Sequence, residues 1–107
     1  MFAVTRLMVL QFAQEPSWTE RAKTVERVAT LYAEGALGGE ERAAALDLFR
    51  VALYDGEPLV RRVLAESIKR ARDLPRDIVR SLARDRPDVS APFLASSPLV
   101  VEEDLID

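Results

Sequence analysis

The chain has 107 residues, of which 49% are hydrophobic and 31% are charged, and its formal net charge is −3. This length suits one domain with its own core, over residues 1–107, without a metal or a disulfide to stabilise it. The sequence contains no cysteine and no histidine. These absences exclude disulfides, thiolate zinc sites, cysteine nucleophiles and the commonest general base, and they are compatible with a cytoplasmic location.

The first apolar segment, residues 4–14, is too short to cross a membrane, which takes about 20 apolar residues. It also lacks the basic region and the cleavage site of a signal peptide. We therefore predict no membrane span and a cytoplasmic location. Because this segment has hardly any polar face, we expect it to be buried on more than one side, beneath the next helices or against another chain. Weak homo-oligomer formation through this N-terminal helix is the second of these options.

Helical periodicity continues along the chain, and no stretch alternates with the period of two that marks a strand. Prolines stand where several apolar-periodic segments begin, as expected for the first turn of a helix. Short connections predict antiparallel neighbours. The fold class is therefore all-α, with about six to seven helices of which the last is incomplete. The predicted helices cover residues 4–14, 17–34, 40–54, 58–71, 75–84 and 88–95, and a last helix opens near Glu102.

Local signals mark several helix ends. Ser17 and Glu20 have the spacing of a capping box. Gly35 and Gly56 each follow a helical segment, which predicts two left-handed helix caps. Pro92 predicts that the helix over residues 88–95 is short or bent.

The sequence contains an internal repeat: residues 55–67 (DGEPLVRRVLAES) are similar to residues 85–97 (DRPDVSAPFLASS), thirty positions later. In this ungapped alignment Leu64 and Ala65 correspond to Leu94 and Ala95, so all four should lie on the buried faces of equivalent helices. Units of this kind bury their apolar sides by stacking on one another.

The end of the chain, residues 102–107, resembles the start of a further unit that stops after about one turn. We therefore expect either that the chain is the N-terminal part of a longer protein or that this segment frays.

The run of Asp55, Val60 and Arg61 resembles the second-helix signature of short HEAT-like repeats. Over residues 25–107, the segments LYAEGALGGEER, VRRVLAE, LPRDIV, LARD and SPLV resemble an alphaproteobacterial domain-of-unknown-function family with short HEAT-like helical repeats. The resemblance implies a HEAT-like superhelical stack without established activity, and it brings no catalytic residue. Ala91 stands where the first copy has Arg61, which interrupts an aspartate–arginine ladder between repeats at that step.

Arg76, Arg80 and Arg84 are spaced four apart and should share one helix face, although like charges at this spacing weakly destabilise a helix. They form either a docking surface or a solvated face that Asp73 and Asp77 partly neutralise. Trp18, the only tryptophan, is either an interface anchor or a staple between the first two helices. The predicted partner-binding residues are Arg72, Arg76, Arg80, Arg84 and Trp18.

No arrangement of residues predicts catalysis. Ser67 and Ser97 have no histidine to activate them. Glu102, Glu103 and Asp104 lack the ligand spacing of a calcium loop. We therefore predict no enzyme, no catalytic residue, no metal and no cofactor.

The function expected from these features is that of a non-enzymatic protein–protein interaction module or scaffold in bacterial regulation or signalling. It would dock an acidic protein partner through its basic helix face. The alternative is a nucleic-acid-binding helical repeat that places the same arginines on phosphates. A pI near 5.0 and the lack of aromatic residues among the arginines argue against nucleic acid.

Overall fold

The computed structural model describes residues 2–106, and this part of the chain is helical without any strand, as predicted. None of its helices is both long and apolar enough to cross a membrane. The elements are α1 (Arg6–Gln14), α2 (Trp18–Ala33), α3 (Gly39–Ala52), α4 (Pro58–Ile68), α5 (Arg76–Ala83), α6 (Pro87–Ser96) and the 3-10 helix η1 (Glu102–Leu105). The predicted helices agree with these bounds to within a few residues at each end.

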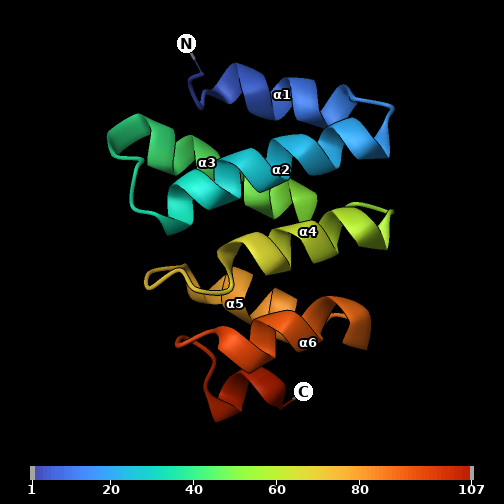
Figure 1. Cartoon of the computed structure of the whole chain (residues 1–107), viewed down its shortest axis with the longest axis vertical. Coiled ribbons are helices and arrows are strands. Elements are labelled where there is room, and N and C mark those ends of the chain that lie inside the picture. The colour runs from blue at the N-terminus through green and yellow to red at the C-terminus, as the bar shows by residue number, and fades with distance from the viewer. Residues whose placement is uncertain (1, 107) are drawn as a thin grey trace.

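The helices stack along the long axis of a molecule that measures 39 × 28 × 18 Å (Figure 1). In one layer α4 lies between α2 and α6 and packs against both. In the other layer α1 packs against α3, and η1 packs against α5. This order is consistent with a stack of helix pairs.

A continuous core fills the space between the two layers, and every helix contributes to it. Tyr32 of α2 and Phe49 of α3 meet edge to face with their ring centroids 5.4 Å apart, a favourable geometry for aromatic rings. The largest fully buried side chains include those of Leu48, Phe49, Leu64, Ile68, Ile78, Leu82 and Phe93.

The start of α2 is capped partly as predicted. The Ser17 hydroxyl accepts a hydrogen bond from the Glu20 N–H at 3.3 Å, which is half of a capping box. The other half comes from outside the helix, because the Glu15 carboxylate accepts the Ser17 N–H at 3.2 Å. The prediction for Gly35 is confirmed: it has φ 72° and ends α2.

The prediction of a left-handed cap at Gly56 is wrong. The glycines with positive φ are Gly35 and Gly39, and Gly39 begins α3. At the turn before α4, the Asp55 carboxylate instead accepts the Glu57 N–H at 2.9 Å. This side-chain bond closes the turn in the manner typical of aspartate, so Gly56 does not need the left-handed conformation.

The ungapped alignment of the repeated phrase misplaces α6 by one residue. Leu64 and Ala65 are fully buried as predicted, but Leu94 is 38% exposed and Ala95 is also exposed. Phe93 is fully buried in their place. The prediction that Leu94 and Ala95 lie on the buried face is therefore wrong.

The one-residue shift of α6 arises from the length of the turn that precedes it. Pro58 and Pro87 each stand in the first turn of their helix, and they are 29 residues apart rather than thirty. The turn after Asp85 is thus one residue shorter than the turn after Asp55. α6 is ten residues long and continues through Pro92.

Candidate interaction surfaces

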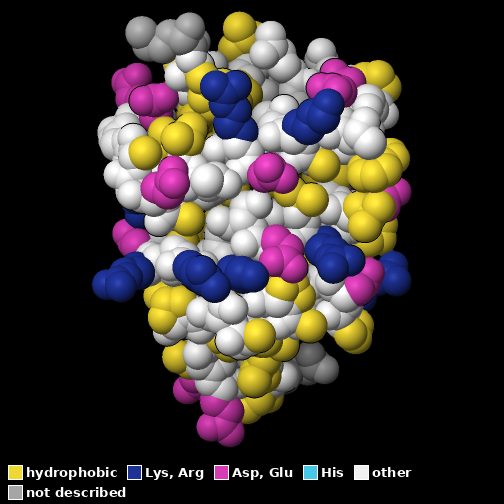
Figure 2. Space-filling view, in the orientation of Figure 1, with side chains coloured by type: hydrophobic (Ala, Val, Ile, Leu, Met, Phe, Trp, Pro, Cys, Tyr) yellow, Lys and Arg dark blue, Asp and Glu magenta, His cyan; other side chains and the backbone are white. Residues whose placement is uncertain are grey.

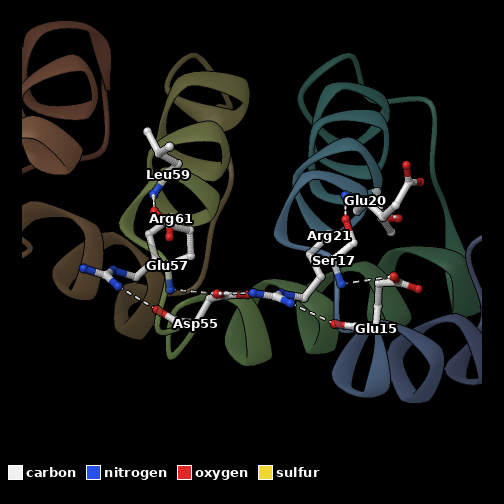
Figure 3. Close-up of polar contacts among 9 residues, drawn as sticks. Glu15, Ser17, Glu20, Arg21, Asp55, Glu57, Leu59 and Arg61 are labelled. Atoms are coloured by element: carbon white, nitrogen blue, oxygen red, sulfur yellow. Dashed lines mark hydrogen bonds and ion pairs between the residues drawn. The ribbon is translucent and has the colours of Figure 1, made fainter.

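Two arginine–aspartate pairs join consecutive parts of the stack, and Figure 3 shows the first of them, between Arg21 and Asp55. Arg21 of α2 donates through Nε and a terminal nitrogen to both carboxylate oxygens of Asp55, at 2.7 and 3.1 Å. Arg61 of α4 donates in the same way to Asp85, at 2.8 and 3.2 Å. These four side chains are at most 19% exposed. They hold the stack together and offer little surface to a partner.

Each of these arginines also donates to the backbone carbonyl six positions before it. Arg21 binds the carbonyl of Glu15 at 2.8 Å, and Arg61 binds that of Asp55 at 2.6 Å. The hydrogen bonds to aspartate raise the pKa of both guanidinium groups, because they stabilise the charged form. Within residues 2–106 the ladder ends at Asp85, because the position that corresponds to Arg61 once the shift of α6 is corrected is Ser90, one residue before Ala91, and neither residue carries a guanidinium.

The predicted arginine stripe lies on one face of α5 and contacts the C-terminal segment. Arg76 donates to Asp104 Oδ2 at 2.7 Å and to the Leu99 carbonyl at 2.9 Å. Arg84 donates to the carbonyl of Asp104 at 3.1 Å and to that of Ile106. Nε of Arg80, the third member, lies 3.9 Å from Asp104 Oδ1. This face of α5 is therefore occupied from within the chain.

The acids expected to neutralise this stripe pair elsewhere. Asp73 accepts a hydrogen bond from Arg42 at 2.6 Å, and Asp77 accepts two from Arg50, at 2.9 and 3.2 Å. The bonds from Arg50 lower the pKa of Asp77. Both acids thus tie α5 and the segment before it to α3, and Asp104 is the acid that the stripe contacts.

A groove between α2 and α4 contains Trp18. Trp18 and Leu59, at the starts of the two helices, are each 41% exposed, and Val63 lies beside them. Trp18 therefore lies partly exposed beside α4, at the start of α2. The rim carries Glu26, Arg62 and Glu66.

A second hollow lies at the other end of α4, next to the end of α6. It is lined by Arg70, Arg72, Ser96, Pro98 and Leu99. Both arginines are exposed, and neither has an ion pair among the described residues. Figure 2 shows a row of basic side chains across this part of the molecule, at the level of α4 and α6.

One stripe of α4 connects the groove to the hollow. Positions three and four apart share a helix face, and the open positions follow this spacing from the groove towards Arg70, just beyond the helix end. We call this the α4 face; it consists of Trp18, Leu59, Arg62, Val63, Glu66, Ser67, Arg70 and Arg72.

Of the predicted partner-binding residues, Trp18 and Arg72 belong to the α4 face, whereas Arg76, Arg80 and Arg84 lie on α5. The sequence reasoning missed Arg62 and Arg70. Their three- and four-residue spacing from Leu59, Val63 and Glu66 would have placed them on the same face.

Comparisons with protein-family models, with curated proteins and with solved structures find no match to this chain. Membership in the HEAT-like family therefore stays a prediction.

Proposed function

We propose that the chain is a non-enzymatic interaction module, a HEAT-like helical stack that binds an acidic protein segment on its α4 face. One observation carries the proposal: the α4 face joins an apolar groove to three arginines, Arg62, Arg70 and Arg72, that have no acidic partner within residues 2–106. An acidic partner would supply the missing charges.

The chemistry of the groove suits a protein partner. Tryptophan and arginine are enriched among residues that dominate binding energy, and Trp18 stands beside Arg62 in the groove. Charged rims around an apolar centre orient a partner and speed its association. Glu26 and Glu66 on the same rim would repel a phosphate backbone, which is charged at every nucleotide, whereas a protein segment can place an apolar side chain beside them and its carboxylate near Arg70 and Arg72.

The length of the face defines the partner segment. Leu59 and Arg70 are eleven positions apart, and at about 1.5 Å per helical residue this separates the groove from the hollow by about 16 Å. A matching segment would place an apolar side chain in the groove and a carboxylate between Arg70 and Arg72. Either a helix or a shorter extended segment spans this distance.

We place this module in the cytoplasm, as a scaffold in bacterial regulation or signalling. The lack of cysteine fits a reducing compartment, and the resemblance to HEAT-like repeats fits a scaffold.

The test is affinity capture from the native cytoplasm with the wild type, Arg70→Glu combined with Arg72→Glu, Trp18→Ala and the control Arg6→Glu. Arg6 is 89% exposed and lies away from the α4 face. Partners would be identified, purified and titrated by calorimetry.

We expect both α4-face variants to weaken binding by about tenfold or more, a typical loss for a central contact, and Arg6→Glu to leave it unchanged. Equal binding by all variants would refute the proposal. Binding of duplex DNA or RNA that weakens steeply with salt would favour the nucleic-acid alternative instead.

A further inference from the structure

The C-terminal segment over residues 101–106 is held on α5 by polar contacts, whereas Leu99 and Val100 just before it pack against the core. Its apolar residues Val101, Leu105 and Ile106 are 46%, 54% and 57% exposed, whereas Asp104 is fully buried. A segment that served as a structural cap would be expected to bury its apolar side chains and expose its acid. This inverted pattern is typical of a bound ligand, with one charged anchor in a charged site.

The arginines of α5 contact one carboxylate of the segment and its backbone carbonyls. Asp104 Oδ2 accepts hydrogen bonds from Arg76 at 2.7 Å and from the Val101 N–H at 2.8 Å. The remaining bonds from α5 go to the carbonyls of Leu99, Asp104 and Ile106. No side chain of the segment other than Asp104 takes part in these bonds, so the site selects an acid in a turn and tolerates varied neighbours.

The arginines of this site also have hydrogen-bond donors that Asp104 does not use. Asp104 Oδ1 is buried without a hydrogen bond, and Arg80 Nε is 3.9 Å away, beyond hydrogen-bond distance. The side chains of Arg76 and Arg80 remain 49% and 46% exposed. An arriving acidic segment can therefore reach these arginines while the internal segment is still bound.

We propose that the arginine face of α5, formed by Arg76, Arg80 and Arg84, is a second interaction surface that binds an acidic segment of a partner protein. Residues 101–106 occupy it as an intramolecular ligand, and the partner displaces them. This surface is separate from the α4 face, and its test uses different variants.

The internal segment is tethered next to its site, and this tether determines how strongly the segment weakens the binding of an external peptide. A segment joined to its site by a short linker competes at an effective concentration in the millimolar range. If the internal segment fills the site in about nine molecules of ten, it weakens the apparent affinity for an external segment by about tenfold. Weakening the internal contact should therefore strengthen binding from outside.

The experiment uses the full chain as wild type, as Asp104→Ala and as Asp104→Asn. The probe is a fluorescent peptide of residues 97–106 with a blocked N-terminus and an amidated C-terminus. A second peptide carries asparagine in place of Asp104. Glu103→Ala is the matched control, because Glu103 is a neighbouring acid that is exposed and whose side chain makes no hydrogen bond or ion pair with α5 among the described residues.

We expect Asp104→Ala and Asp104→Asn to bind the acidic peptide about tenfold more tightly than the wild type and Glu103→Ala do. The asparagine peptide should bind weakly to all of them. Adding Arg76→Gln and Arg80→Gln to Asp104→Ala should abolish binding. Amide hydrogen exchange should become faster in residues 101–106 and stay slow in α2 and α4.

Two results would overturn the proposal. In the first, the exchange data show release of residues 101–106, yet the acidic peptide does not bind at about millimolar concentration, the range set by the tether. In the second, both Asp104 variants lose protection in α2 and α4, which would make the segment a structural cap.

Discussion

Arg21 and Arg61 occupy equivalent places in the stack. Each lies six positions after an acidic turn residue, Glu15 or Asp55, and binds the carbonyl of that residue. Each then extends to the aspartate of the following turn. A bidentate arginine–carboxylate pair fixes direction as well as distance, so these contacts set how each helix pair lies on the next.

Asp55 is the central residue of this ladder, and its loss should be costly. Asp55→Ala would leave the guanidinium of Arg21, which is 19% exposed, without its carboxylate, at a cost of about 3 kcal/mol. As a control, Asp47→Ala removes only long ion pairs of 3.8 and 4.0 Å at an exposed site, and should cost less than about 0.5 kcal/mol. Urea unfolding of both variants measures the difference, and equal losses would show that the ladder does not stabilise the fold.

The ladder was only partly predictable from the sequence. The echo between residues 55–67 and 85–97 indicated where it would stop, because neither Ala91, the match to Arg61 in the ungapped alignment, nor Ser90, the match in the structure, has a guanidinium. The pair of Arg21 with Asp55 was not predicted. The first two units are forty positions apart, because the connection around Gly35 is longer, so the equivalence of Arg21 with Arg61 does not show at an offset of thirty.

Among the elements, α6 shows how a helix can be predicted correctly and still be placed in the wrong register. Prolines and short turns fix where helices begin, since they act on the local backbone. The buried face depends instead on the length of the preceding turn. One missing residue rotates a helix by about 100°, which is enough to exchange Phe93 for Leu94 in the core.

This register can be tested with a matched pair of leucines. Leu64→Ala should cost about 2–5 kcal/mol because Leu64 is fully buried in α4. Leu94→Ala should cost less than about 1 kcal/mol, because Leu94 is 38% exposed. Both losses would be measured by urea unfolding. A large loss at Leu94 would restore the ungapped alignment and contradict the structure of α6.

The helix α5 marks the limit of what sequence spacing reveals about a surface. A spacing of four placed Arg76, Arg80 and Arg84 on one face, and the structure agrees. The spacing gave no indication of what covers that face, because Asp104 lies twenty or more positions away. Long-range partners of this kind depend on the path of the whole chain.

At the scale of the whole molecule, the two ends of the stack differ in chemistry. At one end, η1 places Asp104 against the arginines of α5. At the other end, α1 buries Phe12 but leaves Leu7 and Leu10 each 62% exposed, so within residues 2–106 this helix is not buried on more than one side. Stacked helical proteins usually need a polar outer face on their terminal units to stay soluble. An apolar end of this kind favours contact between copies of the chain.

We therefore predict that Leu7→Gln combined with Leu10→Gln reduces self-association and leaves stability within about 0.5 kcal/mol of the wild type, because both side chains already face solvent. Sedimentation velocity over a range of protein concentrations would measure association, and thermal unfolding would measure stability. Tyr54→Gln is the control, since Tyr54 is 89% exposed but lies after α3, away from this end. If the sedimentation of the double variant depends on concentration as that of the wild type does, α1 is not the contact between copies. A large loss of stability would instead mean that Leu7 and Leu10 are buried in solution.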